Sequence, residues 1–209
     1  MSERRESIAA AIVAGGASSR FGGIPKGLER IGGRRIVDRV VDAAKTVADD
    51  LVFVSNSEDA DQWVGGVRVV RDIRPERGSL IGIHTALSAT RARTIVLAWD
   101  MPFVTAGLLE IIVAHSHAEP FAVIPEGPSG LEPFCALYSP ACLPFVTQAI
   151  DAGDLRATAL PLRFPSVTRV SSSEVRAVGD PARLFFNVNS AADLARAEEM
   201  DSEERSRQR

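Results

Sequence analysis

AAIVAGGASSRFGGIPKGL, residues 10–28, joins an apolar run to a glycine-rich loop that carries two cations. The apolar run spans residues 8–14 and fits a strand covered on both faces, where apolar and polar side chains need not alternate. Gly15 and Gly16 follow, and without a Cβ atom their backbone can approach a ligand closely. Arg20 and Lys26 add positive charge to the same loop, and such side chains commonly bind phosphates. The stretch therefore predicts a triphosphate site.

Two common nucleotide-binding motifs are missing from this loop. It contains neither GxxxxGK followed by Ser or Thr, which marks a P-loop, nor the GxGxxG fingerprint of dinucleotide-binding folds. A glycine-rich loop with exposed cations is common in proteins and by itself would be explained as ordinary loop structure. A nucleotide site therefore needs support from other parts of the chain.

Strand-like and helix-like segments alternate along the first half of the chain. The expected strands are 8–14, 51–56, 67–72, 94–100 and 121–127, and the expected helices are 36–50, 81–92 and 105–118. Such alternation predicts an α/β fold with a mainly parallel sheet. In the second half we expect a strand at 130–140, a helix at 140–153 that Gly153 ends, and a short strand, a turn and a helix within 185–200.

Polar residues lie where three of these strands end: Asn56, Asp72 and Asp100. In a parallel sheet, ligands bind beyond the carboxyl ends of the strands. Asp100 ends the strand TIVLAWD, and a carboxylate there could hold Mg²⁺ together with phosphate oxygens. It could instead form a turn before Met101 and Pro102. Asp72 is a second candidate, although pairing with a nearby arginine would explain it nearly as well.

Composition and charge narrow the range of functions. The 209 residues suit one domain, which we place at 1–200, and residues 201–209 lack apolar side chains and are expected to form a disordered tail. A net charge of −3 gives no basic bias, so nucleic acid is not expected as a partner. No apolar stretch has the length of a membrane span, so no membrane association is expected. Cys135 and Cys142 form no CxxC pair and are expected to be reduced in a cytoplasmic protein.

Four segments in order resemble one enzyme family. They are VAGGASSRFGGIPKG, RDIRPERGSLIG, WDMPF and FNVN. Together they resemble the nucleotidyltransferases of the molybdenum cofactor guanylyltransferase family, and the order and spacing agree over residues 8–198. The resemblance implies a three-layer, Rossmann-like nucleotidyltransferase fold with a mainly parallel central sheet.

The resemblance also implies a reaction and the residues that perform it. GMP is transferred from GTP to the phosphate of molybdopterin carrying molybdenum, which gives the guanine dinucleotide cofactor and pyrophosphate, with Mg²⁺ as the cofactor. Arg20, Lys26 and Asp100 match the catalytic positions, and Asp100 matches the metal ligand. The implied nucleotide-binding residues are Ala14, Gly15, Gly16, Lys26, Asn56, Asp72, Gly78, Leu80, Gly82 and Asp100. Asn187 and Asn189 match a segment that binds the acceptor, and the product would pass to molybdoenzymes or their chaperones.

The chain departs from the family pattern at three positions. Pro25 stands where aspartate is frequent, Ser79 where proline is frequent, and Trp99 where cysteine is frequent. None of these changes removes a charged group, so they bear on the substrate more than on the class of reaction. Relatives that use CTP tend to have a second alanine in place of Gly15, which favours GTP for this chain.

Two other functions stay open at the level of the sequence. The first is a related nucleotidyltransferase that uses CTP or another phosphorylated acceptor. The second is a noncatalytic carrier of the molybdenum cofactor that keeps the fold without turnover. Arg20, Lys26 and Asp100 argue against a carrier, because a protein without turnover has little need of all three charges.

Overall fold

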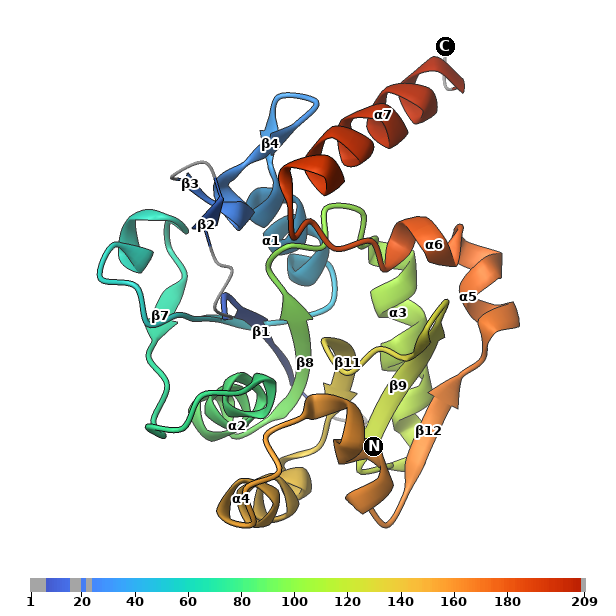
Figure 1. Ribbon diagram of the computed structural model, residues 1–209. Helices are drawn as coiled ribbons and strands as arrows, with labels where there is room; N and C mark the ends of the chain where they lie inside the picture. Colours follow the sequence, from blue (N-terminus) through green and yellow to red (C-terminus); the bar gives the residue numbers. More distant parts are fainter. Residues whose placement is uncertain (1–6, 16–19, 22–23, 208–209) are drawn as a thin grey trace.

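Strand β1 (Ile8–Val13) lies in the middle of an eight-stranded sheet. The computed structural model describes residues 7–15, 20–21 and 24–207 (Figure 1). β1 pairs in parallel with β6 (Asp50–Val54) on one side and with β8 (Arg93–Ala98) on the other. β7 (Arg68–Val70) continues the parallel half beyond β6. These strands follow the order and the approximate limits that the sequence predicts.

The other half of the sheet is mixed. β11 (Cys135–Tyr138) runs antiparallel between β8 and β9 (Ala122–Gly127). β10 (Gly130–Leu131) pairs antiparallel with β9, and β12 (Val167–Val170) pairs parallel with it. The single strand expected at 130–140 is therefore two strands, separated by a segment that contains Pro133, which has no N–H to donate to a ladder.

Helices cover both faces of the sheet and make three layers (Figure 1). α1 (Ile36–Lys45), α3 (Ala106–Ala114) and α5 (Ser172–Val178) pack on one face. α2 (Ser79–Thr90) and α4 (Leu143–Asp151) pack on the other. The expected limits of α2 and α3 are close: Thr105 caps α3 by accepting from the N–H of Leu108. Gly153, with φ of +77°, follows the end of α4. The helix expected at 36–50 is shorter, because α1 ends at Lys45 and β6 already begins at Asp50.

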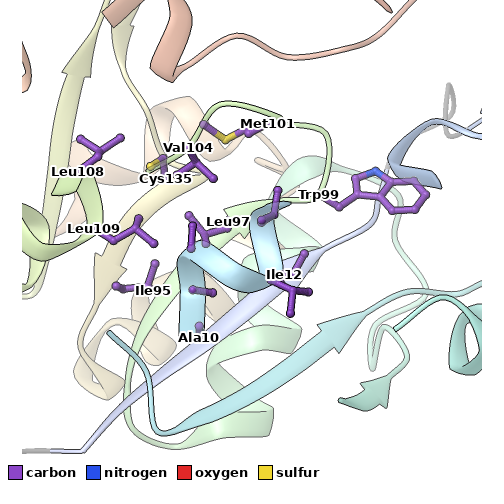
Figure 2. Packing of buried hydrophobic residues seen from close by; sticks show 14 of the residues in the cluster. Ala10, Ile12, Ile95, Leu97, Trp99, Met101, Val104, Leu108, Leu109 and Cys135 are labelled. Carbon is purple, nitrogen blue, oxygen red and sulfur yellow. The ribbon is translucent and has the colours of Figure 1, made fainter. Parts of the chain in front are cut away.

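Alternate residues of β1 enter different layers of the core. Ala10 and Ile12 belong to the cluster under α1 and α3, where Figure 2 shows them beside Ile95 and Leu97 of β8. Ala11 and Val13 belong to the cluster under α2. Because both faces are buried, the strand is apolar throughout, and this explains the uninterrupted apolar run in the sequence.

The C-terminal segment differs from what the sequence predicts. Residues 186–189 form no strand; the N–H of Val188 instead donates to the backbone oxygen of Asp100 at 3.0 Å. α6 (Pro181–Leu184) precedes them and α7 (Ala191–Arg207) follows, so the chain is helical at 201–207, where we expected disorder. The reason is a charged contact: Asp201 is buried and pairs with Arg39 of α1 at 2.9 Å, which a search for apolar side chains cannot detect.

Short elements complete the fold. α7 lies next to the hairpin of β4 (Arg30–Ile31) and β5 (Arg34–Arg35), and a small apolar cluster joins them (Figure 1). The remaining elements are the β2 (Arg20–Phe21) and β3 (Ile24–Pro25) pair and the 3₁₀ turns η1 (Lys26–Leu28), η2 (Ala60–Gln62), η3 (His115–Ala118), η4 (Pro140–Cys142) and η5 (Ala157–Arg163). Within the described ranges, no helix combines the length and apolar character needed to span a bilayer.

Both cysteines are free and buried, as the sequence predicts. Cys135 lies in β11 and Cys142 ends η4, where its Sγ contacts the backbone oxygen of Phe121 at 2.9 Å. Burial raises the pKa of both thiols, that of Cys142 to about 12. They are unreactive core residues, because the thiolate is the reactive form.

Candidate nucleotide site

The direction of chain growth across the sheet reverses at β1. The chain moves from β1 to β6 and β7, and then returns to the opposite side of β1 as β8. Loops that leave neighbouring strands in opposite directions create the usual ligand crevice of open α/β sheets. The loop after β1 begins at Ala14 and Gly15, and the loop after β8 begins at Trp99 and Asp100. Two of the loops that the sequence singled out, those that carry Lys26 and Asp100, therefore start at this switch point.

Three polar residues from distant parts of the chain meet at this edge. Lys26 forms an ion pair with Oδ2 of Asp100, and its Nζ donates a hydrogen bond to Oδ1 of Asn189 at 2.9 Å. Lys26 is 4% exposed and Asp100 is 5% exposed. Isolated buried charges are costly, so each ion depends on the other for its place in the protein. We call Lys26, Asp100 and Asn189 the polar triad.

The start of α7 fixes the backbone that carries Asn189. Oδ2 of Asp193 accepts from the N–H of Asn189 at 3.0 Å and from the hydroxyl of Ser190 at 2.9 Å. The Ser190 hydroxyl in turn accepts from the N–H of Asp193 at 3.2 Å. These bonds satisfy the N–H groups of Asn189 and Asp193 at the start of the helix. Ser190 thus caps α7, and the side chain of Asn189 accepts from Lys26.

Asn187, the other asparagine of the late motif, is not part of the polar triad. Its Nδ2 donates to the backbone oxygen of Phe185 at 2.9 Å, two residues earlier. The structure therefore separates the two asparagines that the sequence grouped together. The side chain of Asn189 binds Lys26 at the carboxyl edge of the sheet, and that of Asn187 stabilises the turn that precedes Asn189.

A second polar cluster joins Asn56, Asp72 and Thr85. Nδ2 of Asn56 donates to Oδ2 of Asp72 at 2.7 Å, and Oδ1 of Asn56 accepts from the N–H of Asp72 at 2.8 Å. The hydroxyl of Thr85 donates to Oδ1 of Asp72 at 3.1 Å. These bonds tie the loops after β6 and β7 to α2. Asp72 is therefore paired with Asn56 and Thr85, whereas the alternative from sequence was a nearby arginine.

Gly78, Leu80 and Gly82 make packing contacts where α2 begins. A Cβ atom on Gly82 would lie 2.5 Å from Cγ1 of Val13, and one on Gly78 would lie 2.5 Å from Cβ of Leu155. Leu80 is 1% exposed, and its N–H donates to the backbone oxygen of Leu155 at 3.0 Å. The Gly82 contact brings the start of α2 close to the end of β1. Packing therefore accounts for part of the requirement for Gly78, Leu80 and Gly82 in this segment.

The first loop is described only in part. The N–H of Ala14 donates to the backbone oxygen of Val54 at 2.8 Å, and Gly15 is exposed. Gly16 lies outside the described residues, as does the side chain of Arg20, whose backbone belongs to β2. The predictions for these two residues therefore rest on the sequence.

The described residues fit a divalent metal that arrives with a nucleotide. They include no group of three or more His, Cys, Asp or Glu side chains that could hold an ion without further ligands. Asp100 and Asn189 offer oxygen ligands at the crevice edge, where both now bind the Lys26 ammonium. Mg²⁺ usually takes one or two carboxylates and completes its octahedron with phosphates and water. A single buried carboxylate matches this requirement.

His84, to which the sequence assigns no function, is a buried neutral imidazole near the second cluster. The hydroxyl of Thr147 donates to the backbone oxygen of Leu143 at 2.9 Å, so it accepts from Nε2 of His84 at 3.1 Å. Nδ1 is buried and has no partner among the described residues. Burial lowers the pKa of His84 and the charge of Arg74 lowers it further, against the opposing charges of Asp151, Glu76 and Asp72.

We expect the burial of His84 to lower the free energy of unfolding of the protein in mild acid. Its pKa in the folded state lies below its unfolded value, so the unfolded state binds a proton first, and stability falls as pH drops through about 6.5. The measurement is urea unfolding of wild type and His84→Gln at several pH values between about 7.5 and about 5.5. The variant should lose less stability than wild type over this range, whereas the exposed control His117→Gln should follow wild type. Equal losses in wild type and His84→Gln would contradict the prediction.

Known proteins resemble this chain over nearly all of its length. The MobA-like NTP transferase domain matches residues 10–163. A molybdenum cofactor guanylyltransferase of Desulfosudis oleivorans is 34% identical over 194 residues, which are 92% of this chain and 95% of that protein. A probable molybdenum cofactor guanylyltransferase of Pelotomaculum thermopropionicum is 33% identical over 90% of this chain and 91% of its own length. The crystal structure of molybdopterin-guanine dinucleotide biosynthesis protein A from Archaeoglobus fulgidus has a TM-score of 0.78 at 27% identity, covering 93% of this chain and 99% of that one.

Proposed function

This chain belongs to the MobA-like NTP transferase family, and from that premise we propose that it transfers GMP from GTP to the phosphate of molybdopterin carrying molybdenum. The products are the guanine dinucleotide cofactor and pyrophosphate. The observation that carries the proposal is the polar triad, a buried cation, carboxylate and amide at the switch point of the sheet. Such a group serves a reaction between anions better than it serves stability, because its charges are costly to bury.

The residues divide between the two substrates. Ala14, Gly15 and Gly16 contact the base and phosphates of GTP, and Arg20 and Lys26 neutralise the triphosphate. The remaining residues that we assign to the nucleotide are Asn56, Asp72, Gly78, Leu80, Gly82 and Asp100. Asn187 and Asn189 lie on the side of the acceptor. The side chains of Asn56 and Asp72 already bind one another, which supports a shared role in holding the loops around the base.

The chemistry needs no nucleophile from the protein. An oxygen of the acceptor phosphate attacks the α-phosphorus of GTP, a new P–O bond forms, and the bond to the leaving pyrophosphate breaks. Positioning and charge neutralisation can supply most of the catalysis in phosphoryl transfer. Lys26 is suited to this task, because its ammonium lies among oxygen ligands and can exchange them for phosphate oxygens.

Asp100 would hold Mg²⁺ together with the triphosphate. The metal would neutralise charge that builds up on the phosphates during transfer. When Lys26 turns to the triphosphate, the carboxylate of Asp100 becomes available to a cation, so the two changes suit one another. We expect the reaction to occur in the cytoplasm and its product to pass to molybdoenzymes or their chaperones.

Titration calorimetry with nucleotides tests the proposal. Purified protein is titrated with GTP, CTP, ATP and UTP, each with Mg²⁺, and pyrophosphate release is then followed with GTP and molybdopterin carrying molybdenum. We expect selective binding of GTP and release of pyrophosphate that requires the acceptor. Preference for CTP would overturn the assignment of the base, and tight binding of the cofactor without consumption of GTP would indicate a carrier.

A further inference from the structure

The backbone of η1, which carries Lys26, rests on the ring of Trp99. A Cβ atom on Gly27 would lie 2.3 Å from Cε3 and 2.6 Å from Cδ2 of Trp99. No side chain would fit there without a shift of the ring or of the backbone. Gly27 follows Lys26 directly, so the contact lies next to the residue whose ammonium enters the polar triad. The position of the indole therefore limits where Lys26 can lie.

Aromatic side chains also pack against the indole. Trp99 stacks on Trp63 with ring centroids 5.4 Å apart and planes 19° apart, and it meets Phe53 of β6 edge to face at 6.1 Å. Trp99 is 1% exposed. Its Nε1 is buried and has no hydrogen-bond partner among the described residues, and the contacts that these residues make with the ring are packing contacts. In Figure 2 the ring lies at the end of the row of core residues, away from Leu108 and Leu109.

The backbone of the same residue carries the other ion of the pair. The N–H of Trp99 donates to the backbone oxygen of Val13 at 3.2 Å, which extends the pairing of β8 with β1 by one residue. Asp100 follows immediately, so its Cα is fixed to the sheet. Trp99 thus connects Asp100 to the sheet through its backbone and supports Lys26 through its ring.

We propose that Trp99 is a positioning residue that sets the place of Lys26 relative to Asp100. Among the described residues the buried indole N–H has no acceptor, and a phenylalanine would fill the core without this donor. The size of the ring, which reaches from Trp63 to Gly27, explains why it is present. Only the expected effect of Trp99 on turnover rests on the proposed function. The position of Lys26 can be measured whether or not the protein has that function.

Lysine acylation provides that measurement. The chain has two lysines, Lys26 and Lys45. Lys26 is buried and Lys45, at the end of α1, is exposed. An amine-reactive ester applied to the whole protein therefore labels Lys45 as an internal reference, and mass spectrometry gives the ratio of the two rates. We expect Lys26 to react at least about tenfold more slowly than Lys45 in wild type, because it must first leave the polar triad.

The variants are Trp99→Ala, Trp99→Phe and the matched control Phe164→Ala. Phe164 is also a buried aromatic residue, but it packs on Tyr138 in the core layer under α2 and α4, whereas Trp99 lies in the layer under α1 and α3. Trp99→Ala should raise the labelling of Lys26 relative to Lys45 by about tenfold, and Trp99→Phe should give an intermediate value and remain folded. Phe164→Ala should leave the ratio near that of wild type at a similar loss of stability. In turnover, Trp99→Ala should lower kcat more than it raises the KM for GTP.

The outcomes separate the possible explanations. Unchanged protection of Lys26 in both Trp99 variants would overturn the proposal and leave Trp99 as a core residue. Equal deprotection in Phe164→Ala would also overturn it, because the effect would then be one of general stability. Wild type without GTP binding or turnover would contradict the proposed function alone, and the labelling ratios would still decide the role of Trp99.

Discussion

Replacement of Lys26 by methionine is expected to reduce turnover by about 10²- to 10³-fold, the usual loss when a group that stabilises transition-state charge is removed. Methionine keeps much of the length of the side chain but cannot neutralise the triphosphate. The same change should lower the free energy of unfolding by about 3–5 kcal/mol, because Asp100 is 5% exposed and would keep a buried charge without its partner. Pyrophosphate release and urea unfolding measure the two effects.

Two further variants separate catalysis from folding. Lys45→Met removes the other lysine, which is exposed, and should leave both turnover and stability near wild type. The double variant Lys26→Met with Asp100→Leu removes both buried charges, and it should recover much of the lost stability while turnover stays low. Turnover within a few-fold of wild type in a folded Lys26→Met protein would contradict a role for Lys26 at the triphosphate.

Asp100→Asn is expected to lower turnover by at least about a hundredfold, because the amide keeps the shape of the carboxylate but loses the charge that attracts a divalent cation. It should also weaken the binding of Mn²⁺, used as a spectroscopic substitute for Mg²⁺, in the presence of GTP. The measurement is the electron paramagnetic resonance signal of free Mn²⁺ during titration. This readout does not depend on the acceptor or on turnover.

The exposed Asp61 in η2 provides the matched control. Asp61→Asn makes the same chemical change away from the polar triad and should leave Mn²⁺ binding and turnover unchanged. Stability of Asp100→Asn should fall, because Lys26 would lose its ionic partner, so binding is measured well below the unfolding temperature. Unchanged Mn²⁺ affinity in the folded Asp100→Asn protein would remove Asp100 as the metal ligand.

The pattern of apolar residues predicts a strand well where helices bury both faces of the sheet. The run at 8–14 is apolar throughout, and the structure buries both faces of β1 between α1 and α2. Patterns fail where contacts are charged or irregular. The expected strand within 185–189 is a loop held through Val188 to Asp100, and the expected disorder at 201–207 is a helix held through Asp201 and Arg39. Each of these contacts joins residues far apart in the sequence, so the pattern of neighbouring residues cannot reveal it.

The sequence by itself determined the class of fold and the residue types of the candidate site. The run before Gly15, the cations of the first loop and Asp100 after a buried strand required only neighbours in the chain and the rule that ligands bind at the carboxyl edge of the sheet. Tertiary structure alone decided which of these residues meet. Lys26 and Asn189 are 163 positions apart, and the ring of Trp99, just after β8, lies against Gly27 of η1. Contacts between distant segments depend on how the layers pack, because side chains in a close-packed interior take their positions from all their neighbours at once.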